Sequence, residues 1–397
     1  MTSDFTRANH TIILSDIHLS EAEPPHPGNP LWKRFKRPKL FIDRSFRRFL
    51  ESLTEKISEP IELVLNGDIF DFDSVMTQPK EQIFKVSWFE KKRGLSAEED
   101  KSRFKMRVIL YDHEVWVSAI REFILKGNKV VFIVGNHDME LHWPSVQKEV
   151  LLGIDLPEEF KDSIRFCEWF YISNSDTLIE HGNQYDAYCL CSNPVHPLIK
   201  KRSKHYVRLP FGNLAGKYML NGMGLFNPHV ESSFIMSFKQ YFIFFYKYVL
   251  RTQPAIIFTW FWSAMATMIV SIKEGLMPAL KDPLMVEARV NEIAKKSNTT
   301  PGVVLSLKEV HAHPAIFNPY KILKELWLDR ALLFILILFF SFQFYSFVNV
   351  FFVVSVWWFI IPLTFLLPFF LFYAHTVTSD VYSVQKTARK SVPIISQ

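Results

Sequence analysis

Hydrophobic residues gather in four short runs in the first half of the chain, and each run ends in polar side chains. The runs cover residues 11–15, 62–66, 130–134 and 177–180. Their length and β-branched content are typical of buried strands, and each breaks into a glycine or polar turn. The ends of neighbouring strands meet at one edge of an open α/β sheet, where such sheets bind their ligands. The pattern therefore predicts an α/β fold with a polar site at that edge.

The second half of the chain has a different pattern. Residues 331–374 contain no Asp, Glu, Lys, Arg or His. A helix that crosses a membrane needs about 20 apolar residues, so this stretch is long enough for two. Gln343, Ser346 and Asn349 offer a place to turn. Soluble helices normally keep a polar face, which is absent here, and we predict a transmembrane helical hairpin over residues 331–374.

The region before this hairpin, residues 231–330, is predicted to be helical and associated with a membrane. Residues 252–272 are uncharged and form a candidate span. Arg251 and Lys273 flank the candidate span with positive charge on both sides, which disfavours a single crossing. An interfacial or re-entrant helix fits equally well, and its topology stays open.

Net charge and cysteine content indicate the cellular compartment and the kinds of partner to expect. The 397 residues carry a formal net charge of +6, which suits an anionic substrate or an anionic membrane surface. The three cysteines form neither a disulfide framework nor a zinc knuckle, so we expect a reducing compartment. Basic clusters lie at residues 32–37 and 200–204, but no base-reading motif accompanies them, and we expect no nucleic-acid partner. Basic residues at both ends of the hairpin predict that residues 1–230 and the tail, residues 375–397, lie in the cytosol at the inner (cytoplasmic) membrane.

The side chains after the first two runs are typical metal ligands. Asp16 and His18 are two residues apart, which would place them on one side of an extended segment. A carboxylate with an imidazole favours Mn, Fe or Zn over Mg or Ca. Gly67 allows the backbone to approach an ion, and the two oxygens of Asp68 can bridge two ions.

The later runs add further donors. Asn136 offers an amide oxygen, His137 an imidazole that can point at a substrate instead, and His181 an imidazole for a second ion. Each residue also has a plainer interpretation, since a lone histidine after a strand is often a hydrogen-bonded structural residue. Asp71 and Asp138 suit a turn or a helix cap as well as a site. The order of the four clusters makes chance a poor explanation.

These motifs resemble a known family. Ser15–His18, Asn66–Asp71 and Gly135–Asp138 are similar to the motifs of the calcineurin-like metallophosphoesterases. The resemblance covers about Thr11 to Asp186, and the forms at Asp68–Phe72 and His181–Gly182 are most similar to the branch of UDP-2,3-diacylglucosamine pyrophosphatases. It implies a four-layer α/β/β/α sandwich within residues 1–230.

The resemblance also implies roles for individual residues. His137 would protonate the leaving group or stabilise charge in the transition state, and Asp71 would orient it. The implied reaction is hydrolysis of a phosphate ester or pyrophosphate bond by a metal-activated hydroxide, on a phosphorylated small molecule, a lipid or a nucleotide-lipid. Two divalent metal ions (Mn, Fe or Zn) would be held by Asp16, His18, Asp68, Asn136 and His181.

One family motif is missing. The family closes its site with a Gly-His-x-His turn, and the only His-x-His here, His311 and His313, lacks the glycine. Either these histidines replace the missing ligands, or the hairpin interrupts the domain and the chain ends just short of them, after a strand over residues 391–396. The corresponding alternative function is an impaired family member that acts as a membrane-bound binding protein.

Overall fold

The computed structural model describes residues 5–22, 42–191, 193, 195–201, 204–223, 246, 256–277, 283–361 and 388. The strands are β1 (His10–Leu14), β2 (Ile61–Asn66), β3 (Lys129–Ile133), β4 (Ile164–Cys167), β5 (Phe170–Ser173), β6 (Thr177–Glu180), β7 (Leu198–Lys201) and β8 (Lys204–Val207). The α-helices are α2 (Asp43–Lys56), α3 (Trp88–Arg93), α4 (Glu99–Asp112), α5 (Glu114–Leu125), α6 (Pro144–Ile154), α7 (Phe211–Ala215), α8 (Asn221–Met223), α10 (Ile256–Leu276), α11 (Pro283–Lys296), α12 (Pro301–Glu309), α13 (Pro319–Glu325) and α14 (Leu328–Phe351). The shorter turns of helix are η1 (Met139–His142), η2 (Glu158–Ser163), η3 (Asn183–Tyr185), the π-helical η4 (Gly216–Leu220) and η7 (Ala315–Phe317).

A parallel sheet of four strands forms the centre of the fold. Its order is β1-β2-β3-β4, and every neighbouring pair is parallel. Most residues of β2 and β3 are buried. Strands covered on both faces are made of continuous apolar residues, which explains the unbroken runs in the sequence. Three of the four predicted strands are confirmed as neighbours in this sheet, with helices in the crossover connections.

The fourth predicted strand is not a neighbour of the other three. It is β6, which pairs with β5 in a separate antiparallel hairpin. This hairpin packs on one face of the parallel sheet, where Tyr171 and Ile179 contact Val64 and Val131. The expectation that all four runs end at the edge of one sheet is therefore wrong, because the fourth run belongs to a second layer.

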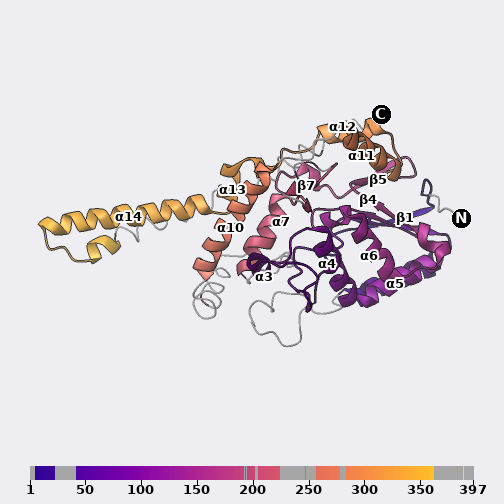
Figure 1. The fold of residues 1–397 in the computed structure, drawn as a ribbon, viewed down its shortest axis with the longest axis horizontal. Coiled ribbons are helices and arrows are strands. Elements are labelled where there is room, and N and C mark those ends of the chain that lie inside the picture. The colour runs from indigo at the N-terminus through magenta and orange to yellow at the C-terminus, as the bar shows by residue number, and fades with distance from the viewer. Residues whose placement is uncertain are drawn as a thin grey trace.

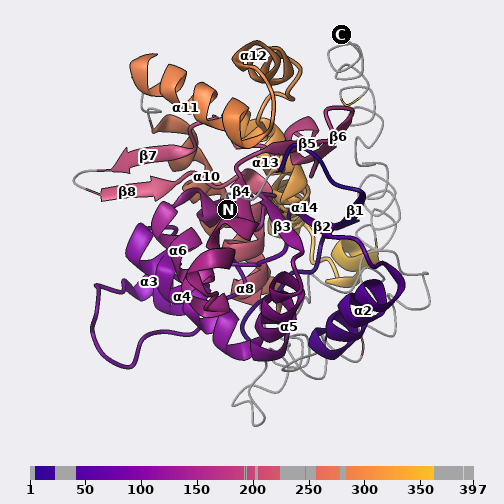
Figure 2. The same ribbon diagram turned by 90° about the vertical axis from the view of Figure 1, so that its right-hand side faces the viewer.

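Helices cover the two outer faces of these β layers (Figure 2). The crossover helices α2, α4, α5 and α6 pack on the free face of the parallel sheet around residues such as Trp116. On the other side, Val290 of α11 and Val304 of α12 pack against Phe170 of the hairpin. The layers thus follow the order helices, parallel sheet, hairpin, helices, in agreement with the predicted α/β class. Residues 283–309 contribute one of these layers although they follow residue 230.

The candidate span over residues 252–272 falls largely on α10. Its buried side is made of small residues, namely Ser263, Ala264, Thr267 and Ser271, which pack towards α7, η4 and α8. Its opposite side exposes large apolar residues such as Trp262. The helix therefore packs its small residues inward and exposes Phe258, Phe261 and Trp262, whereas a soluble amphipathic helix buries its large apolar residues.

Helix α14 projects away from the layered body (Figure 1). Within the described residues it is the one helix that is long and apolar enough to cross a membrane, by length and composition alone. After Phe351 the chain turns back, because the Asn349 side chain accepts a hydrogen bond from Val354 N (3.0 Å) and the Phe359 ring contacts Phe342. The second limb of the predicted hairpin from residue 362, and the predicted strand over residues 391–396, lie outside the described residues, so the hairpin stays a prediction.

Candidate metal centre

Three clusters of candidate ligands meet at the carboxyl edge of the parallel sheet. Asp16 and His18 follow β1, Asp68 and Asp71 follow β2, and Asn136 follows β3. Because these strands are adjacent and parallel, their following loops lie side by side. The sequence prediction of a shared polar edge is correct for these three runs.

His181 reaches the same place from the second layer. It follows β6, and Asn66 at the end of β2 connects the two layers. The Asn66 side chain donates to the carbonyl of Glu180 (3.1 Å), and the Asn66 carbonyl accepts a hydrogen bond from Nδ1 of His181 (3.1 Å). Because a carbonyl oxygen only accepts, Nδ1 of His181 carries a proton, and Nε2 is the ring nitrogen that faces Asp68.

The backbone is strained at three of the candidate ligands. Asp16, His18 and Asp68 have φ values of 56°, 53° and 53°, in the left-handed region that L-residues seldom adopt. Hydrogen bonds between the loops hold this conformation, from Asp16 N to Gly67 O (3.1 Å) and from His18 N to Asp68 O (2.9 Å). Strained residues gather at functional sites, where the surrounding structure enforces them. The predicted extended segment at Asp16 and His18 is therefore wrong, because β1 ends at Leu14 and a turn brings the two side chains together.

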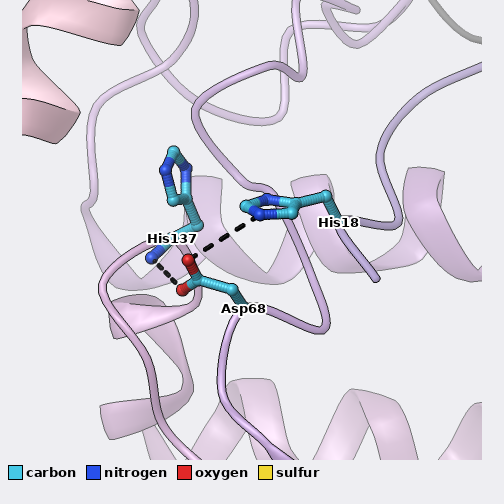
Figure 3. A group of neighbouring side chains, drawn as sticks. All are labelled: His18, Asp68 and His137. Carbon is cyan, nitrogen blue, oxygen red and sulfur yellow. Dashed lines mark hydrogen bonds and ion pairs between the residues drawn. The ribbon is translucent and has the colours of Figure 1, made fainter. Parts of the chain in front are cut away.

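The carboxylate of Asp68 lies at the centre of the cluster. Figure 3 shows it between the ring of His18 and the backbone nitrogen of His137, which donates to Oδ1 (2.8 Å). Its other oxygen, Oδ2, lies 3.8 Å from Nε2 of His18 and 3.3 Å from Nε2 of His181. Oδ1 of Asp16 lies 3.9 Å from Nε2 of His18. Two imidazoles thus approach one carboxylate oxygen, as expected around a shared ligand.

His137 is placed by Asp71. Its Nδ1 lies 3.5 Å from Oδ1 of Asp71, and its ring meets the ring of His18 edge-on at 4.8 Å. Asp71 also accepts hydrogen bonds from the backbone nitrogens of Asp73 and Ser74 (both 3.1 Å). Asp71 therefore fills both of the roles considered for it, the turn and the contact with His137.

Asp138 is a turn residue in this fold. Its carboxylate accepts hydrogen bonds from the backbone nitrogens of Gly135 and of Ile69 (2.9 Å for Ile69). These bonds tie the loop after β3 to the loop after β2. Of the two interpretations of Asp138, the structural one fits its contacts.

The amide of Asn136 is oriented by a residue that the sequence did not reveal. Asn213 of α7 is fully buried, and its Nδ2 donates to the Asn136 carbonyl (2.7 Å) and to Oδ2 of Asp73 (2.6 Å). Its Oδ1 then accepts from Nδ2 of Asn136 at 3.5 Å, so the Asn136 side-chain oxygen is the atom left for a cation. Nothing local marks Asn213, because it lies 77 residues after Asn136 in the chain.

Opposite charges perturb the pKa values at this edge. Burial would raise the pKa of Asp68, but a hydrogen bond with His181 and the charges of the nearby histidines lower it to about 2. Burial would lower the pKa of His181, but the contact with Asp68 raises it to about 9. Likewise, the hydrogen bond with Asp71 outweighs burial and raises the pKa of His137 to about 10.

Two further buried acids carry raised pKa values. Burial and the charge of Asp68 raise the pKa of Asp138 to about 7. Burial, opposed by Lys217 and assisted by Asp71, raises the pKa of Asp73 to about 6. Burial and the neighbouring carboxylates therefore disfavour the charged forms of these two acids, which divalent cations would favour.

The residues present fit a divalent metal centre. Three overlapping groups of potential ligands each have atoms within 4.8 Å of one another: His18, Asp68 and His137; Asp16, Asp68 and His181; and Asp71, Asp73 and His137. Two glycines leave room for them: a Cβ on Gly135 would lie 2.4 Å from Oδ1 of Asp68, and a Cβ on Gly67 would lie 2.5 Å from Cγ of His181. Mixed carboxylate and imidazole donors suit Mn, Fe or Zn.

Comparison with known families agrees with this geometry. Residues 10–206 match the family model described as calcineurin-like phosphoesterase. This match supports the metallophosphoesterase family for this part of the chain. The match and the potential ligand groups support a metal-dependent phosphoester hydrolase. Among curated proteins and solved structures, none matches the chain.

His311 and His313, the candidate replacements for the missing ligands, lie after α12 and outside the potential metal-ligand groups of the described residues. The ring of His311 packs edge-on against Trp169 at 4.5 Å, and burial lowers its pKa to about 4. His313 is exposed. Within the part of the chain that is described, neither joins a potential metal-ligand group. The hypothesis that they replace the last family ligands therefore has no support.

Proposed function

We propose that this chain is a membrane-associated phosphoesterase with two divalent metal ions, which hydrolyses a phosphate ester or pyrophosphate bond. The observation that carries the proposal is the convergence of His18 and His181, from two different layers, on one oxygen of Asp68. A buried carboxylate between two imidazoles suits an ion on each side.

The five predicted ligands can be assigned to two metal ions, with Asp68 shared by both. Asp16 and His18 would hold one ion, since Oδ1 of Asp16 lies 3.9 Å from Nε2 of His18. Asn136 and His181 would hold the other, with Asp68 common to both. When bound, two such ions offset the charge of a phosphoryl group and lower the pKa of water from 15.7 to about 7.

His137 would act as the general acid that protonates the leaving group, or would stabilise charge in the transition state. The carboxylate of Asp71 lies 3.5 Å from Nδ1, and its negative charge favours the protonated ring. The other ring nitrogen can then donate its proton to the leaving oxygen or stabilise charge on the phosphoryl oxygens.

The proposed setting is the cytoplasmic membrane, with the phosphoesterase domain in the cytosol. The support is α14, whose 24 residues extend about 36 Å against a hydrocarbon core of about 30 Å. The proposed substrate is a phosphorylated small molecule, a lipid or a nucleotide-lipid. The forms at Asp68–Phe72 and His181–Gly182, which resemble the UDP-2,3-diacylglucosamine pyrophosphatase branch, support the last class.

The test uses the full chain, purified in a nonionic detergent and stripped of metal with a chelator. We expect hydrolysis of bis(p-nitrophenyl) phosphate only after Mn²⁺ is restored, and two Mn²⁺ per chain by elemental analysis. Asp68→Asn should abolish both, whereas the matched exposed variant Asp100→Asn should change neither. Tight binding of inorganic phosphate without turnover by the unaltered protein would refute the enzyme and favour the binding protein.

A further inference from the structure

A large cavity lies apart from the metal centre, between the segment 82–101 and α10. Its volume is about 1240 Å³, above the range of about 300–1,000 Å³ that is usual for small-molecule sites. Its walls are mostly apolar and aromatic, and include Trp88, Phe89, Phe261, Trp262, Met265 and Ile269. The cavity therefore suits a long apolar ligand.

A layer of buried side chains separates this cavity from the metal centre. Lys217 of η4 lines the cavity and donates to the carbonyl of Leu95. Asn213, four residues earlier, contacts Asn136 and Asp73 at the metal centre. The cavity is therefore a site of its own, behind the ligand-bearing loops.

Half of the charged residues along the cavity are paired with one another. Lys101 lies 2.6 Å from Glu90 and 2.7 Å from Glu98, and Glu98 also pairs with Lys204. These four residues carry no net charge together, so they do not favour a charged ligand.

Two lysines at the cavity are not paired in this way. Lys85 and Lys273 both line it and are exposed to solvent, and neither has an acidic partner among the described residues. Glu274 also lines it, and its charge interacts with that of Arg208. The exposed part of the cavity at Lys85 and Lys273 therefore carries positive charge, which favours an anionic group of a ligand.

The cavity also lies beside the apolar helix. Its α10 wall packs against α13 and α14, and α14 projects from the same end of the molecule (Figure 1). The exposed face of α10 continues the aromatic wall outward, with Phe258 and Trp262 largely exposed. A lipid in a bilayer that holds α14 would have an apolar path into the cavity.

We propose that this cavity binds the acyl chain of an anionic membrane lipid, with the headgroup at Lys85 and Lys273. The apolar walls suit the chain, and the two lysines suit a phosphate or carboxylate headgroup. The proposal rests on α14 lying in a membrane and does not depend on hydrolysis at the metal centre.

The test uses the full chain in nanodiscs of phosphatidylcholine that contain a phosphatidylglycerol with a photoreactive diazirine on its acyl chain. After illumination, peptide mapping locates the labelled residues. We expect labels within residues 82–90 and 261–274, as well as on α14, in metal-free protein. Ala266→Trp and Ile269→Trp each fill the cavity from α10 and should reduce the label at residues 82–90 at least tenfold while α14 keeps its label.

Matched variants separate the cavity from the surrounding bilayer. Leu276→Trp adds the same side chain to an exposed position of α10 outside the cavity and should leave the labelling unchanged. Lys85→Glu and Lys273→Glu should each reduce labelling by phosphatidylglycerol about fivefold relative to a photoreactive phosphatidylcholine, whereas Lys80→Glu should not. Labels confined to α14, equal labelling after both tryptophan substitutions, or a co-purified peptide in the cavity would each overturn the proposal.

Discussion

Gly67→Ala tests the role of His181 without changing any proposed ligand. Gly67 has a φ of +76°, and a Cβ there would lie 2.5 Å from Cγ, 2.6 Å from Nδ1 and 2.7 Å from Cβ of His181. Carbon atoms in contact normally lie about 3.5–4.0 Å apart. The imidazole must therefore move by about 1 Å, or the loop after β2 must move away from it.

Gly127 provides the control, because it shares the backbone strain and lacks the collision. Its φ is +89°, and a Cβ there would meet nothing within 4 Å. An L-residue in the left-handed region costs about 1–2 kcal/mol, so both alanine variants should lose about that much free energy of unfolding. Only Gly67→Ala should also displace His181, and a displacement of about 1 Å can reduce catalysis about 10²-fold.

The assay measures both quantities on the same preparations. Denaturant unfolding in detergent gives the stability, and a Mn²⁺ titration of phosphodiester hydrolysis gives the apparent metal affinity and the rate. We expect both variants to lose stability through backbone strain, with a further loss of about 1–3 kcal/mol in Gly67→Ala from the collision. Weaker metal binding and about 10²-fold lower activity are expected for Gly67→Ala alone. Unchanged metal affinity and rate in Gly67→Ala would refute the reasoning that His181 holds an ion in this position.

Three further predictions follow from buried contacts. Burial lowers the pKa of His142 to about 3, against an ordinary value of 6.5. The unfolded chain therefore takes up this proton first as the pH falls, and stability should drop by about 2 kcal/mol between pH 6.5 and pH 5; His142→Gln should lack this part of the loss in denaturant unfolding. Asn213→Ala should weaken Mn²⁺ binding about 10–100-fold, since it orients Asn136, and a retained affinity would contradict that role. Asp71→Asn should lower the pKa of His137 in the metal-free protein, followed by NMR titration of the ring, and an unchanged titration would show that Asp71 does not hold its proton.

The strands and most of the candidate site could be predicted because the relevant patterns are local. The apolar runs that became β2 and β3 have the composition of strands buried on both faces, and their polar ends follow directly in sequence. The run that became β1 forms an edge strand, whose residues are only partly buried or exposed. Asp68 and its glycine are adjacent, so their place at the edge could be read from the chain.

The remaining features depend on contacts between distant segments. The run before His181 has the same pattern as the others, and periodicity does not reveal which sheet a strand joins. The left-handed turn at Asp16 depends on a hydrogen bond to Gly67, 51 residues later in the chain. Asn213 reaches Asn136 only after the chain has passed through both β layers, so neither position signals the other.

Because His181 comes from the second β layer, the proposed metal ions would also stabilise the packing between the two layers. Asp68 belongs to the parallel sheet, whereas His181 belongs to the β5–β6 hairpin, so an ion held by both would join the two layers like a removable cross-link. A ligand at 100 times its Kd stabilises the folded state by about 2.7 kcal/mol. Metal loss would therefore loosen the hairpin first, with faster hydrogen exchange at Phe170–Glu180, and the metal supply of the cell would set the rigidity of the domain as well as its activity.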